Sequence, residues 1–468
     1  MKRKYVKVIT AVIGMAIMNG HPLTLNAKSK KNRTATPTGI TIHGYGETAS
    51  FSVDSKNLRT DEPIQVSATH GFEVSPHEIS PNGKGSVTSM ITNILLAANL
   101  KVGKFTSPHL VKYNERINLN GKDISDEDFA TAITAVKVAA DSVVKKGVCE
   151  QPTQFEILTA AAFLYFYLQK VDYAVIEVGM GGLWDSTNVI TPVVSVITNV
   201  ALDHTDRCGK TLERIAMQKA GIIKEKVPLV TAAEGNEALG PIVSLAMFKE
   251  APVYLYGKAF HGTEVKSSME GQTFTLHAGD FYHSDYEIKL PGEHQIKNTS
   301  VAIVAAKLVS KQDDRINELA LHVGVANTVW PGRLERIHKN PDIILDGAHN
   351  PDGAKALRNA LDKYYPGKQV QFVFGMMGDK DMSGVIKTLI KQDDVVYTVR
   401  ADEGARAAEA ADLAKLVGSN AVAEADLATA YDAAIRGAGT DGVVCVCGSL
   451  YLVGEFKKML LADKRAMN

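Results

Sequence analysis

The residues best suited to chemistry begin with a glycine-rich run, Gly83-Lys84-Gly85-Ser86, which precedes a helix-like stretch. Glycines allow backbone N–H groups to approach an anion closely, and the N-terminus of the following helix favours negative charge. In a nucleotide-binding loop, Lys84 would reach the terminal phosphates and the Ser86 hydroxyl would hold Mg²⁺. A glycine-rich turn with a surface lysine is the alternative interpretation of the same four residues.

Further candidate residues follow predicted strands or helices. Glu177 ends the strand-like stretch DYAVIEVGM and His204 follows VVSVITNV, so both are expected at the carboxyl edge of a sheet, where α/β folds bind ligands. Glu177 is a candidate Mg²⁺ ligand, and His204 is a candidate metal ligand or base. A Glu177–lysine pair and a structural His204 are the alternatives. Lys219 ends a predicted helix, where the helix dipole favours lysine in any case.

The second half of the chain adds another group. Arg333 lies in WPGRLERI, and Asp346 and His349 lie in ILDGAHNPDG. The turn with Asp346 and His349 joins a predicted strand to a predicted helix. We expect it to face a nucleotide across a cleft between two domains.

Composition limits the class of protein. The 468 residues are 45% hydrophobic and 22% charged, which is typical of a soluble globular protein with two or three domains. The 52 basic and 52 acidic residues cancel, so no overall charge favours a nucleic acid or an anionic membrane as partner. Four cysteines are too few for a disulfide framework, and Cys445 and Cys447 are predicted to be buried in a strand rather than to bind metal.

Strands and helices alternate after Pro81, which predicts a mostly parallel sheet with helices on both faces. The fold class is therefore α/β, with a P-loop-type ATPase domain over residues 81–328 and a smaller Rossmann-like domain over residues 329–468. Within the first domain, the segment 251–290, including PVYLYG, QTFTLH and DYEIKL, is predicted to be antiparallel.

The N-terminal part differs from the rest. Residues 1–27 combine a cationic start with an apolar run and have the pattern of a secretory signal; a hydrophobic helix packed on the protein is the alternative. Residues 28–80 contain short alternating runs, such as GITIHGY, ASFSVDS and FEVSPHE, which predict antiparallel strands.

The whole series of motifs resembles the folylpolyglutamate synthase/dihydrofolate synthase family of the Mur ligase superfamily, from about Asn82 to Gly454. The resemblance depends on motifs that occur in family order: NGKGS, KVGKFTSPHLVKYNERI, PTQFE, EVGMGG with DSTN, LDHT, KAGIIK, GEHQIKN, PGRLE, DGAHNP and GSLYLVGE.

The resemblance implies roles for individual residues. Lys84, His204 and Lys219 correspond to catalytic positions, and Lys219 matches the lysine that is carbamylated in this family. The ATP contacts correspond to Asn82, Gly83, Lys84, Gly85, Ser86, Asn298, Arg333 and Asp346. The metal ligands correspond to Ser86, Ser107, Glu177 and His204. The pteroate contacts correspond to Thr153, Gln154, Phe155, Trp184, Asp185 and Ser186.

The family resemblance also implies the reaction: ATP- and Mg²⁺-dependent addition of L-glutamate to folate or dihydropteroate, through an acyl phosphate. It implies a cytoplasmic monomer with no nucleic-acid or membrane partner, although the signal-like segment conflicts with the cytoplasm. A Mur-type peptidoglycan ligase is a neighbouring alternative, against which TSPHL and PTQFE argue. An inactive or misjoined ligase body carried on an exported β-module is the alternative from another class.

The sequence departs from the family pattern at the phosphate loop, where Ser80-Pro81 replaces Gly-Thr, and at Leu183, which replaces an arginine after Gly181-Gly182. Pro81 has no N–H to donate to a phosphate, and Ser80 adds a side chain where the family has none. The loop as written is therefore expected to bind ATP weakly.

Restoring Ser80→Gly together with Pro81→Thr should tighten ATP binding by roughly 1–3 kcal/mol, the scale of one recovered charge-assisted hydrogen bond and relief of strain. Titration calorimetry of both proteins with Mg²⁺ present measures the difference. Equal affinities would show that the loop tolerates Ser80 and Pro81.

Overall fold

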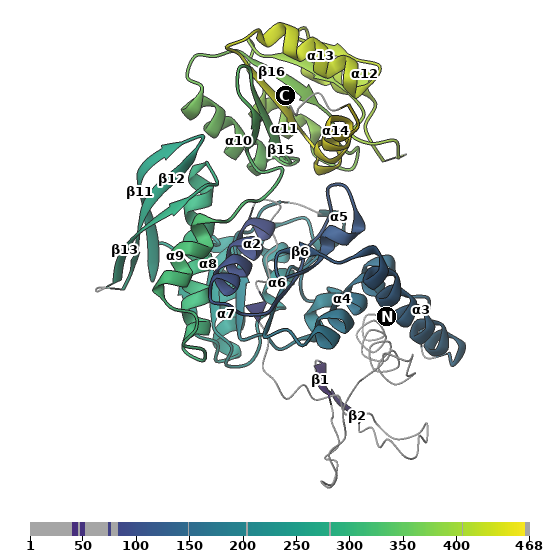
Figure 1. The fold of residues 1–468 in the computed structure, drawn as a ribbon, viewed down its shortest axis with the longest axis vertical. Helices are drawn as coiled ribbons and strands as arrows, with labels where there is room; N and C mark the ends of the chain where they lie inside the picture. The colour runs from purple at the N-terminus through teal and green to yellow at the C-terminus, as the bar shows by residue number, and fades with distance from the viewer. Residues whose placement is uncertain are drawn as a thin grey trace.

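The structure, a computed structural model, describes residues 40–44, 47–51, 74–75, 83–147, 149–202, 205–279, 282–404 and 406–463 (Figure 1). The signal-like pattern of residues 1–27 and the expectations for Ser80, Pro81, Asn82 and His204 fall outside these ranges. Within the ranges, no helix is long and apolar enough to cross a bilayer.

The larger sheet has eight strands in the order β10-β9-β8-β3-β7-β4-β5-β6. The strands from β10 to β4 run parallel, and β5 and β6 add an antiparallel edge. The strands are β3 (Val74–Ser75), β4 (Val102–Phe105), β5 (Ile117–Leu119), β6 (Lys122–Asp123), β7 (Tyr173–Ile176), β8 (Val194–Ile197), β9 (Leu229–Thr231) and β10 (Val253–Leu255).

Helices cover both faces of this sheet, because successive strand residues point to opposite sides. Val175 packs with α2, α8 and α9 in one core, whereas Ala174 and Ile176 pack with α3 and α4 in another. Ile197 and Leu229 pack with α6 and α7 on that second face. The helices are α2 (Lys84–Ala97), α3 (Asp126–Lys145), α4 (Gln154–Gln169), α5 (Thr205–Cys208), α6 (Leu212–Ala220), α7 (Asn236–Phe248), α8 (Glu293–Ser310) and α9 (Glu318–Ala326). The predicted parallel sheet covered on both faces is confirmed.

Two predictions of antiparallel pairing were wrong. The run FEVSPHE contains β3, which pairs in parallel with β7 and β8 in the middle of the sheet. The run PVYLYG contains β10, which pairs in parallel with β9. Strands joined through a helical crossover run parallel, and the local alternation of a short segment does not reveal which strand will be its partner.

Other short strands do pair in the predicted antiparallel way. β1 (Ile40–Gly44) and β2 (Glu47–Phe51) form a hairpin. A separate three-stranded sheet is formed by β11 (Phe260–Ser268), β12 (Gly271–Ala278) and β13 (Tyr282–Ile288), and it confirms the prediction for QTFTLH and DYEIKL. In Figure 1 this sheet flanks α8 and α9.

The C-terminal part contains a second sheet of six strands in the order β14-β15-β19-β16-β17-β18, which is parallel except for β14. α10 (Pro351–Tyr364), α11 (Met382–Leu389) and α12 (Ala410–Val417) cover one face, and α13 (Leu427–Ala438) and α14 (Leu450–Asp463) cover the other. The strands are β14 (Glu335–His338), β15 (Asp342–Asp346), β16 (Val370–Phe374), β17 (Val395–Thr398), β18 (Ala421–Ala423) and β19 (Val443–Cys447).

This second sheet supports the Rossmann-like part of the fold prediction. Cys445 and Cys447 are fully buried in β19 with free thiols, which confirms that they pack in the core. Figure 1 shows this part as the yellow-green layer above the larger sheet. The chain crosses between the two parts after α9, so the boundary predicted at residues 328–329 lies in the connection that leads to β14.

Candidate functional site

The glycine-rich run forms the start of α2, with Gly83 at the N-cap and Lys84 as the first helical residue. A methyl group on Gly83 would lie 2.9 Å from Oδ1 of Asn298, a buried residue of α8, and 3.4 Å from the Thr198 side chain. A larger residue at this position would have to displace the Asn298 amide. The structure thus brings together Gly83 and Asn298, two residues that the family resemblance assigns to ATP.

The second glycine of the run is covered by an aromatic ring. A methyl group on Gly85 would overlap the indole of Trp330, which lies just before β14. Ser86 is buried, and its Oγ accepts a hydrogen bond from Nε2 of Gln295 at 3.3 Å. Residues from α8 and from the connection between the sheets therefore enclose the first turn of α2.

Lys84 extends to the carboxyl end of β7. Its Nζ donates to the carbonyl oxygens of Val178 at 3.4 Å and Gly179 at 3.3 Å, and lies 3.9 Å from Oε1 of Glu177. The other oxygen of Glu177 accepts the backbone N–H of Ser107 at 3.0 Å. Three predicted site residues, Lys84, Ser107 and Glu177, are therefore in one cluster.

Glu177 is the electrostatic centre of this cluster, with a side chain only 3% exposed. Burial raises the pKa of its carboxyl group, because the charged form is poorly solvated there. The positive charge of Lys84 and the N–H of Ser107 oppose this rise. The positive charges of Arg333 and Lys104 oppose it as well, so cations from both large parts of the fold favour the ionised form of this carboxylate.

The C-terminal part contributes Arg333 and Asp346. Asp346 ends β15, and its two oxygens accept the backbone N–H groups of Leu334 at 2.7 Å and Ala348 at 2.8 Å. A methyl group on Gly347 would lie 2.5 Å from Nη1 of Arg333. Burial lowers the pKa of Arg333, and the carboxylates of Asp346 and Glu177 oppose the change.

Asp346 therefore shapes the turn that holds Arg333. Burial raises the pKa of Asp346, whereas Arg333 and the two backbone donors lower it. His349, in the same turn, has its Nδ1 2.7 Å from the carbonyl oxygen of Gly347. The predicted turn DGAHNP is thus fixed by local hydrogen bonds and lies against the Arg333 side chain.

The glycine loop after β7 is held by Asp185. Its carboxylate accepts the N–H groups of Met180 at 2.8 Å and Thr187 at 3.0 Å, and the Thr187 hydroxyl at 2.6 Å. Burial raises the pKa of Asp185, and these donors oppose the rise. Asp185 therefore positions the loop, while its neighbour Trp184 is 47% exposed. Ser186 begins the 3₁₀ turn that Asp185 caps.

This loop also contacts α6. Leu183 donates its N–H to the carbonyl oxygen of Gln218 at 2.8 Å, and a methyl group on Gly221 would overlap Leu183. Lys219, next to Gln218, is only 3% exposed. Leu183, the residue that departs from the family pattern, is therefore a packing contact between the loop and the helix end that carries Lys219.

The predicted substrate residues at the start of α4 lie beside the same loop. Thr153 caps α4 and exchanges hydrogen bonds with Glu156. Gln154 donates from Nε2 to the Tyr113 hydroxyl at 2.8 Å. A methyl group on Gly179 would lie 2.5 Å from the ring of Phe155. Phe155 is thus in contact with the glycine loop, close to the carbonyl that Lys84 contacts.

Sequence reasoning missed three residues of this region: Lys104, Trp330 and His294. The Nζ of Lys104 lies 4.9 Å from the centre of the Trp330 ring, which is a cation–π distance. Burial lowers the pKa of Lys104, and the carboxylates of Asp123 and Glu177 oppose the change. A lysine within an otherwise buried strand, VGKF, was the available signal.

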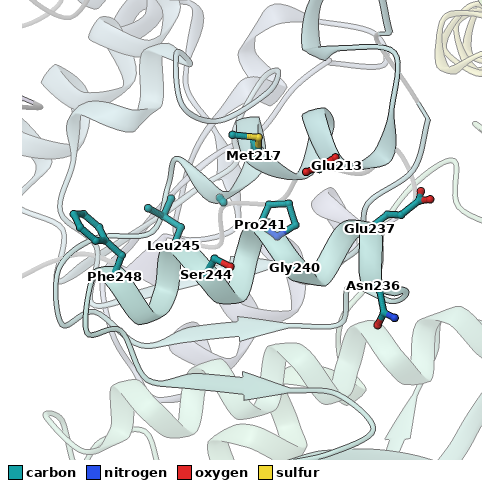
Figure 2. Close-up of a pocket in the computed structure, with 10 residues that line it drawn as sticks. Glu213, Met217, Asn236, Glu237, Gly240, Pro241, Ser244, Leu245 and Phe248 are labelled. Atoms are coloured by element: carbon teal, nitrogen blue, oxygen red, sulfur yellow. The ribbon is translucent and has the colours of Figure 1, made fainter.

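A groove that is separate from these residues lies between α6 and α7 (Figure 2). It has a volume of about 540 Å³, and Figure 2 shows Met217, Leu245 and Phe248 along it. None of the predicted site residues line it. The candidate site is therefore defined by converging polar groups rather than by this apolar groove.

Comparisons with known proteins identify the family of both large parts of the chain. Residues 81–306 match the Mur ligase middle domain, and residues 332–450 match the glutamate ligase domain of Mur ligases. The chain is 34% identical to the dihydrofolate synthase/folylpolyglutamate synthase of Bacillus subtilis, over 82% of this chain and 90% of that protein. It is 36% identical to the folylpolyglutamate synthase of Lacticaseibacillus casei, over 83% of this chain and 90% of that protein.

Solved structures give the same result. The folylpolyglutamate synthase of Mycobacterium tuberculosis, complexed with ADP and AMPPCP, superposes with a TM-score of 0.76 at 28% identity, over 84% of this chain and 92% of that one. The Escherichia coli protein FolC, in complex with DHPP and ADP, superposes with a TM-score of 0.73 at 27% identity, over 84% of this chain and 89% of that one.

His294, at the start of α8, gives a prediction that depends on pH. Burial lowers its pKa from 6.5 to about 4, and Arg333 acts in the same direction. The unfolded chain therefore takes up a proton on this histidine at a higher pH than the folded chain. The contribution of His294 leaves the free energy of unfolding unchanged above about pH 6.5. As the pH drops toward 4, the free energy of unfolding falls, by at most about 3 kcal/mol. His294→Gln should reduce this loss.

Thermal unfolding of the wild type and His294→Gln between pH 7 and pH 4 measures the effect. His338→Gln, at an exposed histidine of β14, is the matched control and should follow the wild-type curve. Parallel curves for wild type and His294→Gln would contradict the assignment of a half-buried, neutral His294.

Proposed function

Because the chain belongs to the dihydrofolate synthase/folylpolyglutamate synthase family of Mur ligases, we propose that its β7 edge carries out the family's reaction with the residues described above. The chain is an ATP-dependent ligase that joins L-glutamate to a folate-type acceptor. The observation that carries the residue assignment is the position of Lys84 at the start of α2, 3.9 Å from the buried Glu177, whose carboxylate also interacts electrostatically with Arg333 of the C-terminal part. These comparisons do not support the alternative of an inactive or misjoined ligase body.

The reaction has two steps. The acceptor carboxylate attacks the γ-phosphorus of ATP, ADP leaves, and an acyl phosphate forms. The amine of L-glutamate then attacks the acyl carbon, a proton is lost from the nitrogen, and inorganic phosphate leaves as the amide forms. Neither step needs a nucleophile from the protein. The protein therefore contributes by orienting the reactants and by stabilising the charge that develops on the phosphoryl oxygens.

The cations at the β7 edge are suited to that task. In our proposal Lys84 moves from the carbonyl oxygens of Val178 and Gly179 to the phosphate oxygens, and Arg333 approaches them from the other side. The N-terminus of α2 supplies backbone N–H groups to the same phosphates. Asn298 and Asp346 complete the proposed ATP site. Asn298 lies against Gly83. Asp346 fixes the backbone beside Arg333 by accepting the N–H of Leu334.

The donor set also fits Mg²⁺, which prefers oxygen ligands. The Ser86 hydroxyl, the Glu177 carboxylate and Ser107 lie at the start of α2 and the ends of β7 and β4, so these residues would hold the ion. When bound, Mg²⁺ would neutralise phosphate charge. His204 is proposed as a further ligand from the family pattern alone, as is Asn82 for ATP.

Lys219 is proposed to be carbamylated, which turns a cation into a carboxylate-like group. Its side chain is almost fully buried at the end of α6, next to the glycine loop that Leu183 ties to that helix. A carbamate carries negative charge, so a cation is a suitable partner for it in such a buried position. A second Mg²⁺ is the partner that the family pattern suggests.

The acceptor is proposed to lie between the start of α4 and the glycine loop. Phe155 and the exposed Trp184 offer aromatic faces for a pterin ring, and Gln154 offers an amide. Thr153, Asp185 and Ser186 are proposed to position these groups. The Thr153 side chain caps α4, the Asp185 carboxylate closes the glycine loop, and Ser186 begins the turn that follows it. We further propose that the enzyme is a monomer that works in the cytoplasm, where ATP and folates are available.

The function is tested by incubating the purified protein with labelled glutamate, ATP, Mg²⁺ and either dihydropteroate or a folate. Label should enter the acceptor together with release of one phosphate per amide. Phosphate release without incorporated glutamate would contradict ligation and would indicate a simple ATPase.

Lys84→Ala should lower kcat/KM in this assay on the order of 10²–10³-fold, because the ammonium stabilises charge that develops during phosphoryl transfer. Lys145→Ala, at an exposed lysine in the last turn of α3, is the matched control and should leave kcat/KM unchanged. Unchanged turnover in Lys84→Ala would move the phosphate site elsewhere.

A further inference from the structure

Three histidines lie side by side across the three-stranded sheet. His261 of β11 is directly opposite His277 of β12, and His277 is directly opposite His283 of β13. Directly opposed residues of antiparallel strands have Cβ atoms only about 5 Å apart. The register therefore brings three imidazole rings into one row, in a sheet separate from the one that contains β7.

The contacts between the rings are close and specific. The Nδ1 atoms of His277 and His283 are 2.6 Å apart, and the two rings meet edge to face at 71° with centroids 4.7 Å apart. The ring of His261 instead stacks on His277, nearly parallel at 15°. Two ring nitrogens thus point at one another, and the third ring covers the face of one of them.

This row does not belong to the hydrophobic core. The opposite face of the same sheet carries Phe274, Leu276 and Tyr286, which are fully buried. The histidine face is polar, and beside the row the Thr275 hydroxyl donates to Asp285 at 2.5 Å. Packing of the sheet on α8 therefore does not explain why three imidazoles are gathered on its outer face.

We propose that His277 and His283 form a binding site for a divalent transition metal that favours imidazole, such as Zn²⁺, Ni²⁺ or Cu²⁺. Each ring would give one nitrogen lone pair to the ion. Metal–nitrogen bonds of about 2.0–2.1 Å require nitrogens roughly 3 Å apart, so small ring rotations from the present 2.6 Å are sufficient.

The site would be open on the solvent side. Among the described residues, no group of three or more His, Cys, Asp and Glu side chains is arranged to hold a metal, so water would fill the other ligand positions. His261 supports the pair by stacking on His277. Mg²⁺, which prefers oxygen ligands, is not expected to bind there. The site is therefore chemically separate from the proposed nucleotide site.

Calorimetric titration of the untagged full-length protein with Ni²⁺, in a buffer that does not chelate metals, tests the proposal. One Ni²⁺ should bind per chain at micromolar concentration, and excess Mg²⁺ should not displace it. His277→Gln and His283→Gln should each weaken binding by more than about tenfold, since two-point chelation becomes a single contact. His338→Gln removes a histidine outside the row and should leave the affinity unchanged.

A second measurement identifies the ligands. The electron paramagnetic resonance spectrum of the Cu²⁺ complex should show coupling to two imidazole nitrogens in the wild type, and this signature should be lost in His283→Gln. Circular dichroism confirms that each variant is folded. Wild-type affinity in both His277→Gln and His283→Gln, or no binding by the wild type, would overturn the proposal. Ligation of glutamate is a separate assay, so failure of one proposal is distinguishable from failure of the other.

Discussion

The site depends on one buried carboxylate. Glu177 is almost completely removed from solvent at the end of β7, and a carboxylate in such a place is costly unless charges and donors surround it. Lys84, the Ser107 N–H and Arg333 supply that environment, and each comes from a different segment of the chain. Stabilisation of the Glu177 carboxylate therefore involves the first turn of α2, the segment after β4 and the start of the C-terminal part.

Close backbone approach makes this convergence possible. Gly85 has no side chain, so the indole of Trp330 lies against the first turn of α2, and Lys104 lies over the same ring. Trp330 comes shortly before Arg333 in the connection between the two sheets. Trp330, in the connection between the two sheets, is therefore in direct contact with the phosphate loop at Gly85. This contact couples the placement of the C-terminal part to the conformation of the loop.

Much of this was predictable from sequence. The alternation of strand-like and helix-like segments predicted the parallel sheets, and the positions of Glu177 and Asp346 at strand ends placed them at the carboxyl edges of those sheets. Pairing partners were less accessible: β3 and β10 are short, and only the assembled sheet shows that each runs parallel to its neighbour. Lys104 was missed because its contact with Trp330 joins segments that are far apart in the chain. Asp185 was predicted as a substrate contact, and only the structure shows its carboxylate closing the glycine loop.

The central claim is that Glu177 and Arg333, from separate parts of the fold, act together in one nucleotide site. A double-mutant cycle measures this directly: titration calorimetry gives the affinity for ADP with Mg²⁺ in the wild type, Glu177→Gln, Arg333→Ala and the double variant. The account predicts that the free-energy change in the double variant differs from the sum of the single changes by more than about 0.5 kcal/mol. Additivity within that limit would show that the two residues act independently and would contradict the account.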